Sequence, residues 1–147
     1  MNQISLAEDL YVQVVEPGLT ALSAAKYPAS AAFIDVYDFE RFAFLVGLDV
    51  VADDVVFQVE QATAANGTPK DVTGATKTIA NATDDQKWFL IEVQTDQLDI
   101  NNDYHFVTLD VSGISGTNNA TIALLGYPKK HPVTSHASQL ASVIIAG

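Results

Sequence analysis

The sequence predicts an all-β protein, a single antiparallel β-sandwich or barrel of jelly-roll-like type with about eight strands. Three observations carry this prediction. β-branched and aromatic residues occur in short runs, and Gly, Asn, Asp or Pro interrupts the chain about every ten positions, a spacing typical of antiparallel strands and turns. The third observation is that no long apolar stripe with helical spacing occurs, so little of the chain is expected to be helical.

Length and composition indicate one packed domain. The 147 residues fall within the usual size of a single domain, roughly 100 to 200 residues. Hydrophobic residues make up 48% of the chain and charged residues 17%, which is typical of a globular protein with a core. We expect the core of this single β domain at about residues 32–127, between extended arms at residues 1–31 and 128–147.

The first strands are expected before residue 38. Residues 10–15 form an apolar run that ends at Pro17-Gly18, a pair that stops a strand and begins a turn. The Ala-rich residues 19–32 are broken by Tyr27-Pro28 and are expected to form a loop. Residues 32–37 alternate, which predicts a strand. Its buried side would hold Ala32, Ile34 and Val36, and its partly exposed side Phe33, Asp35 and Tyr37.

The middle of the chain predicts two longer strands and a tight turn. Residues 41–51 are almost continuously apolar, as expected of a strand covered on both faces, and Gly47 marks a bulge or a close backbone approach. Residues 55–62 alternate, which predicts a strand with one core face and one solvent face. Asn66-Gly67 is the strongest turn signal, because both residue types tolerate the positive φ of tight turns.

The remaining strands follow the same pattern. A loop through Gly74 and a short polar edge strand at 76–80 are expected after the turn. Residues 87–95 and 104–111 both alternate, and residues 120–127 return as a final long strand. The inward sides of the two alternating strands would hold Phe89, Ile91 and Val93, and His105, Val107, Leu109 and Val111.

Charge and cysteine content exclude several classes of protein. With 18 acidic and 7 basic side chains the net charge is −11, so nucleic acid would be repelled and is not expected as a partner. The absence of cysteine excludes disulfides, thiolate metal sites and a cysteine nucleophile. The N-terminus lacks a basic signal region, and no apolar run approaches the roughly 18 residues of a membrane span. We expect synthesis in the cytoplasm and no membrane partner.

No catalytic constellation is evident in the sequence. Ser115 lacks the Gly-x-Ser-x-Gly spacing and the strand-to-helix setting of a nucleophile elbow, so a turn serine is predicted. His105, His131 and His136 stand in no setting that would activate a nucleophile. We therefore expect no catalytic residues and no cofactor, and we do not expect an enzyme.

Two groups of acidic residues could form a calcium site or a glycosidase site, but their spacing predicts turns. The loop at residues 96–103 offers oxygen ligands for calcium but lacks EF-hand spacing, so a hydrophilic turn without metal is predicted. The pairs Asp53-Asp54 and Asp84-Asp85 resemble glycosidase acids only superficially, because adjacent acids in a turn point to different sides. The loop's candidate calcium ligands are Asp96, Asp99, Asn101, Asn102 and Asp103.

Three segments, taken together, resemble a known protein family. They are VFQVEQATAANG at 56–67 with KDVTG at 70–74, FLIEV at 89–93 through DQLD at 96–99, and YHFVTLDV at 104–111 leading to LLGY at 124–127. This pattern of strands and turns is similar to that of the capsid decoration proteins of tailed bacteriophages, also called cement or auxiliary head proteins. The resemblance covers about residues 33–127.

The resemblance implies a virion structural function. It implies a β-rich homotrimer on the outer capsid surface, with the major capsid protein as its partner and capsid stabilisation as its role. Apolar residues in the two arms would then contact a neighbouring subunit or the capsid by strand addition or by filling a groove. These expected interface residues are Ile4, Leu6, Leu10, Leu140, Val143, Ile144 and Ile145.

Three alternatives remain open at this point. Trp88, Tyr104 and Phe106 on an outer face, together with the loop acids, would suit a carbohydrate- or cell-surface-binding β-sandwich, although such residues also pack beneath loops or against subunits. A head-completion or tail protein would share the virion class and differ in its location. A hydrolase with an unfamiliar site is the third alternative.

Overall fold

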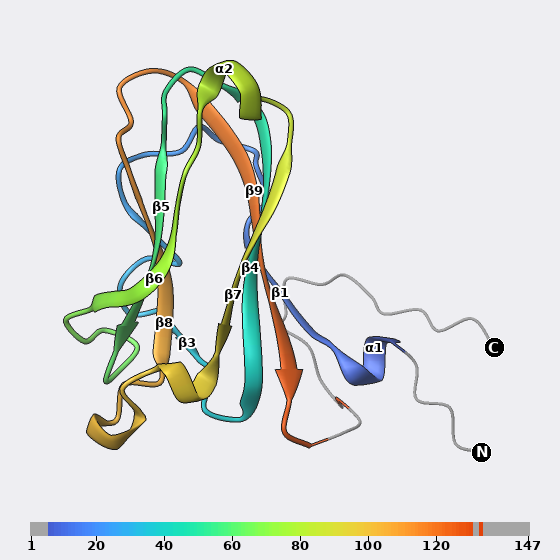
Figure 1. The fold of residues 1–147 in the computed structure, drawn as a ribbon, viewed down its shortest axis with the longest axis vertical. Helices are drawn as coiled ribbons and strands as arrows, with labels where there is room; N and C mark the ends of the chain where they lie inside the picture. Colours follow the sequence, from blue (N-terminus) through green and yellow to red (C-terminus); the bar gives the residue numbers. More distant parts are fainter. Residues whose placement is uncertain (1–5, 131–132, 134–147) are drawn as a thin grey trace.

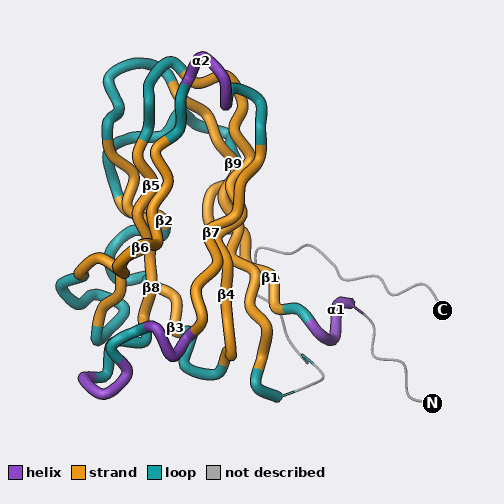
Figure 2. The backbone as a smooth tube through the Cα atoms, in the orientation of Figure 1, coloured by secondary structure: helices purple, strands orange, loops and turns teal. Residues whose placement is uncertain are grey.

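The computed structural model describes residues 6–130 and Val133, and it shows a β-sandwich of two antiparallel sheets. Figure 1 and Figure 2 show the sheets face to face, with short helical turns at the two ends of the sandwich. In the described residues the strands form two open sheets and no closed barrel. The predicted all-β fold is thereby confirmed, and of the two arrangements it is the sandwich.

Sheet A contains the first and the last of the described strands. Its order is β1-β9-β4-β7, so the last strand lies between the first strand and β4. These strands are β1 (Tyr11–Glu16), β9 (Asn118–Pro128), β4 (Phe39–Val51) and β7 (Trp88–Gln94). The strand predicted from the apolar run at residues 10–15 is thus present as β1, which pairs with β9.

Sheet B contains the remaining five of the described strands. Its order is β2-β8-β5-β6, with the short β3 also paired to β8. The strands are β2 (Lys26–Tyr27), β3 (Ile34–Asp35), β5 (Val56–Ala62), β6 (Lys70–Thr78) and β8 (Phe106–Ser112). The helical elements at the ends of the sandwich are α1 (Leu6–Asp9), α2 (Asn81–Asp84) and the 3-10 turns η1 (Thr95–Gln97) and η2 (Ile100–Asn102).

The core lies between the two sheets and follows the alternation of the strands. Phe44 of β4 and Phe57 of β5 are fully buried, and Phe57 packs edge-to-face on Phe89 of β7 with 5.2 Å between the ring centroids. An aromatic pair of this kind adds about 0.5–1.5 kcal/mol beyond the area that it buries. Because Phe57 and Phe89 belong to different sheets, this contact holds the two layers together.

Two details of sheet B differ from the prediction. A loop through Gly74 was expected, but β6 already begins at Lys70. The pairing of β6 with β5 shifts between Gln58 and Glu60, and the extra residues of β6 are accommodated at this shift. The Gln58 amide donates to the carbonyls of Val72 (3.0 Å) and Ala75 (3.3 Å) within this irregularity. A long-range contact of one side chain therefore keeps this stretch in the sheet.

Phe33 also differs from the prediction, since its side chain is only 4% exposed. The strand expected at residues 32–37 is limited to Ile34–Asp35, so period-two alternation does not govern Phe33. Its amide donates to the carbonyl of Ala65 in the turn after β5. Phe33 is therefore buried next to a short strand whose backbone is held to the turn after β5.

Candidate functional site on the outer face of sheet A

The outer face of sheet B is polar, as is usual for the solvent side of a sandwich. The Lys26 ammonium lies 2.5 Å from a Glu60 carboxylate oxygen and 2.9 Å from an Asp110 carboxylate oxygen. Burial lowers the pKa of Lys26, but the hydrogen bonds and charges of these two acids outweigh burial and raise it. This cluster places charged groups on the outer face of sheet B, with Lys26 and Asp110 partly exposed and Glu60 largely buried beneath them.

The outer face of sheet A carries a cluster of apolar side chains among a few polar ones, since Glu92 lies opposite Ala43, Gln94 opposite Arg41 and Thr121 opposite Gly47. In an antiparallel sheet, directly paired residues point to the same side, so the register gives rows that cross the sheet. One row joins Leu45 of β4 to Ala123 and then Val14 on one side, and to Leu90 of β7 on the other. We call this surface the apolar face; it comprises Val12, Val14, Ala43, Leu45, Gly47, Trp88, Leu90, Ala123 and Leu125.

The apolar face is most exposed along β7. Trp88 is 61% exposed and Leu90 is 58% exposed. Burying a large apolar side chain removes it from water with a gain of about 1.5–3 kcal/mol, so a partner placed here gains several such contributions. Contiguous exposed apolar surface of this kind commonly marks an interaction site.

Gly47 shapes this face. The Trp88 indole lies flat over it, and a Cβ at residue 47 would come within 2.5 Å of an indole carbon. The sequence predicted a bulge or a close backbone approach at Gly47, and the structure instead shows the Trp88 side chain in close contact with it. The register shift in β4 lies further along, between Leu48 and Val51.

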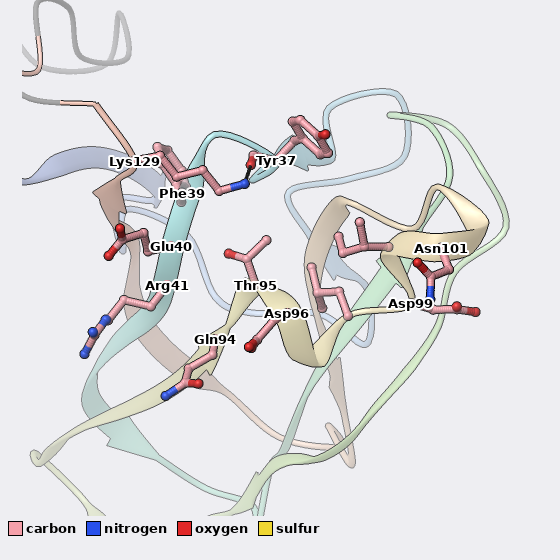
Figure 3. Close-up of a pocket in the computed structure, with 12 residues that line it drawn as sticks. Tyr37, Phe39, Glu40, Arg41, Gln94, Thr95, Asp96, Asp99, Asn101 and Lys129 are labelled. Atoms are coloured by element: carbon pink, nitrogen blue, oxygen red, sulfur yellow. Dashed lines mark hydrogen bonds between the residues drawn. The ribbon is translucent and has the colours of Figure 1, made fainter.

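A pocket lies at the end of the sandwich where β4 begins and β7 ends. Its volume is about 590 Å³, and its lining includes Tyr37, Phe39 and Thr95. Figure 3 shows Lys129 reaching toward Tyr37, where its ammonium donates to the Tyr37 carbonyl at 2.6 Å and lies 4.7 Å from the ring centroid. Thr95 is 4% exposed, and its hydroxyl has no hydrogen-bond partner among the described residues. The pocket combines an apolar floor with a polar rim.

The paired acids bind backbone and side-chain donors in turns. The Asp53 carboxylate accepts hydrogen bonds from the Ser115 amide and hydroxyl, the Gly116 amide and the Asn118 amide group, at 2.6–2.9 Å. The bond from the Ser115 hydroxyl, with the others, holds the pKa of Asp53 far below its usual range. Asp54 and Asp85 accept from the amides of Asn81 and Val51. These acids therefore connect loops, and Ser115 lies in a turn as predicted.

The acidic loop at residues 96–103 is tied to sheet B by Lys70. The Asp99 carboxylate accepts from the Lys70 ammonium at 2.6 Å and from the Asn102 amide at 2.8 Å, and the bond from Lys70 is the main cause of its lowered pKa. Within residues 6–130 and Val133, no three His, Asp or Glu side chains gather in a way that would hold a metal ion. The loop thus forms two 3-10 turns that an ion pair fixes in place.

The aromatic residues considered for sugar binding are not brought together. Trp88 lies on sheet A, whereas Tyr104 and Phe106 lie at the start of β8 in sheet B. The Lys70 ammonium is 3.8 Å from the Tyr104 ring centroid and covers one of its faces. The Phe106 ring packs against His105 with 4.7 Å between centroids. The three rings do not form one platform.

The expected interface residues lie at the ends of the chain. Leu6 is 75% exposed in α1, and Leu10 is half-buried just before β1. The other expected interface residues, Ile4, Leu140, Val143, Ile144 and Ile145, lie outside the described residues. The Val133 amide donates to the Glu8 carbonyl at 2.6 Å, so the described parts of the two ends meet beside the start of β1.

Two features of the sequence indicate part of the apolar face. The continuous apolar run at residues 41–51 predicted a strand covered on both faces, and residues 120–127 place Ala123 and Leu125 between the buried positions. Only the order of the strands in sheet A shows that these residues and Leu90 belong to one surface.

Comparisons of the chain with known protein families, with curated proteins and with solved structures found no significant match. Within the part of the chain that the structure describes, no helix has the length and apolar character needed to cross a membrane.

Proposed function

We propose that this protein is a non-enzymatic structural protein of a phage virion that binds the outside of the assembled capsid and stabilises it. The observation that carries the proposal is the apolar face, which lies outside a sandwich whose core is already complete between the sheets. Its partner would be the major capsid protein, and the assembled form a homotrimer.

The contrast between the two sheets supports binding through sheet A. The outer face of sheet B carries the Lys26, Glu60 and Asp110 charges, which cost free energy to remove from water. The apolar face gains free energy when it is covered. A net charge of −11 keeps the remaining surface soluble at the high copy number that a decorated shell requires.

Cosedimentation with assembled capsids tests the proposal. The shells would be assembled from the major capsid protein of the proposed virion. We expect saturable binding and a raised melting temperature of the decorated shells. Leu90→Asp places a charge on the apolar face and should weaken binding about tenfold or more, as substitutions at the centre of an interface do. Thr78→Asp adds the same charge on the exposed outer side of sheet B and serves as the matched control.

The outcomes separate the interface from the function. Loss of binding by Leu90→Asp and not by Thr78→Asp supports capsid binding through sheet A. Equal loss by both variants contradicts binding through sheet A. Absence of binding by the unchanged protein overturns the capsid proposal.

The pocket favours a second candidate function, a carbohydrate- or cell-surface-binding module. Tyr37 is 50% exposed at the rim, beside the apolar floor and among polar side chains, a combination that suits a ring with hydroxyl groups. Glycan-array binding that Tyr37→Ala abolishes would favour this candidate. Absence of glycan retention by the unchanged protein would count against it.

A further inference from the structure

We propose that the pocket at the end of the sandwich binds an uncharged hexopyranose, with one sugar hydroxyl paired to the hydroxyl of Thr95. The inference rests on the second candidate function, carbohydrate binding, and names the class of sugar and a residue that recognises it. Two independent observations carry it. One is a cavity of ligand size, and the other is a buried hydroxyl in its lining that has no hydrogen-bond partner among the described residues.

The turn that contains Thr95 does not use its hydroxyl. Thr95 opens the 3-10 turn η1 directly after β7 and is 4% exposed. A threonine at the start of a turn often bonds a nearby backbone group. Here the side chain of Gln97 accepts from the Gln94 amide at 2.9 Å, and the Leu98 amide donates to the Thr95 carbonyl at 3.2 Å, so other groups hold the turn. Because buried hydroxyls are normally hydrogen-bonded, the Thr95 hydroxyl is available to a molecule in the pocket.

The pocket has the size and the lining of a sugar site. Its volume of about 590 Å³ falls within the roughly 300–1,000 Å³ of small-molecule pockets. Phe39, Leu98 and Ile100 line it beside Thr95 and supply apolar surface. Figure 3 shows the Thr95 side chain directed away from its own ribbon, toward the side on which Lys129 lies. A pyranose ring matches this lining, because its faces carry C–H groups and its edge carries hydroxyls that both donate and accept.

The charges around the pocket favour a neutral ligand. Three acidic and two basic residues line it, namely Glu40, Asp96, Asp99, Arg41 and Lys129. The Asp99 carboxylate is ion-paired with Lys70 at 2.6 Å, so the charges nearly balance. The Lys129 ammonium donates to the Tyr37 carbonyl, and the Arg41 guanidinium lies 5.7 Å from the Tyr127 ring centroid. An acidic sugar would therefore find both cations directed to other groups, on a protein whose net charge of −11 repels it.

Titration of the protein with single sugars, followed by NMR, tests the proposal. The neutral probes are the methyl glycosides of glucose, galactose and mannose, and N-acetylglucosamine; N-acetylneuraminic acid is the charged comparison. T95V removes the hydroxyl and keeps the shape of the side chain, whereas T95S keeps the hydroxyl. T83V makes the same change in the exposed part of α2, at the opposite end of the sandwich, and is the matched control.

We expect saturable binding of at least one neutral sugar. Its dissociation constant should be about tenfold higher for T95V, which lacks one hydrogen bond to the ligand, and unchanged for T95S and T83V. The melting temperature of T95V should not fall, because the variant removes a buried hydroxyl that has no partner among the described residues. Weaker binding without a loss of stability separates recognition of the sugar from folding.

Several results would overturn the proposal. Equal affinity of T95V and the unchanged protein does so, as does preferential binding of N-acetylneuraminic acid. A lowered melting temperature of T95V would show that the hydroxyl is bonded within the protein and would also overturn it. If sugar binding survives T95V but not Tyr37→Ala, the second candidate function stands and this inference alone fails. Binding of none of the sugars overturns both, whereas capsid binding through sheet A is a separate measurement that none of these outcomes changes.

Discussion

Replacing Asn118 with Ala should destabilise the protein more than any other single polar substitution that the structure suggests. Asn118 is fully buried at the start of β9. Its side-chain oxygen accepts from the amides of Ala52 (2.8 Å) and Asp53 (3.0 Å). Its amide group donates to the Asp53 carboxylate at 2.6 Å and to the Gly116 carbonyl at 3.2 Å. One side chain therefore joins the turn after β4 to the loop before β9.

The magnitude follows from the donors that the substitution leaves behind. In Asn118→Ala the amides of Ala52 and Asp53 lose their acceptor, and a buried unsatisfied donor costs about 1–3 kcal/mol. The two together give a loss of about 2–6 kcal/mol in the free energy of unfolding. Neighbouring Asn119 is half-buried on the opposite side of the strand, so Asn119→Ala is the matched control and should change stability by less than about 0.5 kcal/mol.

Urea unfolding followed by far-UV circular dichroism measures both variants. The reasoning is refuted if Asn118→Ala lowers the free energy of unfolding by less than about 1 kcal/mol, because the four hydrogen bonds would then make no net contribution to stability. The variant Asn118→Asp tests the same site through the pH dependence of its stability. It places a carboxylate against Asp53, and the repulsion should make this variant gain stability relative to Asn118→Ala as the pH falls and one carboxyl is protonated.

Three further predictions concern other parts of the sandwich. The lowered pKa of Asp53 means that its contribution to stability is present above the ordinary aspartate pKa and is lost as the pH falls. Asp53→Asn should therefore lower the melting temperature at pH 7, with a difference that shrinks between about pH 5 and pH 2; a constant difference contradicts this. Gly47→Val should push the indole of Trp88 off the sheet and increase its quenching by acrylamide, and unchanged quenching would show that the ring does not need the glycine. Lys26→Met should cost about 1–2 kcal/mol, because the mostly buried Glu60 carboxylate loses its ammonium partner, and adding Glu60→Gln should restore part of this stability in a double-mutant cycle; additive effects would contradict the pairing.

The strands that the sequence predicted best are those whose inward and outward residues are set by local alternation. β7 and β8 have the predicted buried positions, because Ile91, Val93 and Leu109 face a single core. The part of β6 before residue 76 escaped prediction because the Gln58 amide, far away in the sequence, bonds within its irregular stretch. Local alternation contains no information about such a contact.

The candidate sites were harder to predict because they combine distant segments. The pocket gathers residues 37–41, 94–101 and Lys129, which no short motif connects. The apolar face needs the order of strands in sheet A, which places β9 between β1 and β4. The apolar run at residues 41–51 predicted a strand covered on both faces, but it could not show that the outer side of β4 joins the exposed Leu90 and Trp88 in one surface.

The position of β9 inside sheet A also determines when the protein can fold during translation. β1 leaves the ribosome before the other described strands, yet in the described residues its sheet partner is β9, with Tyr11 opposite Gly126. The strands of sheet B all precede Gly113 and are synthesised earlier. Since contacts between distant segments form slowly and only after both have emerged, β1 cannot pair with β9 until the strands between them have been synthesised. Until β9 arrives, the β1 segment of the nascent chain is open to association with other chains.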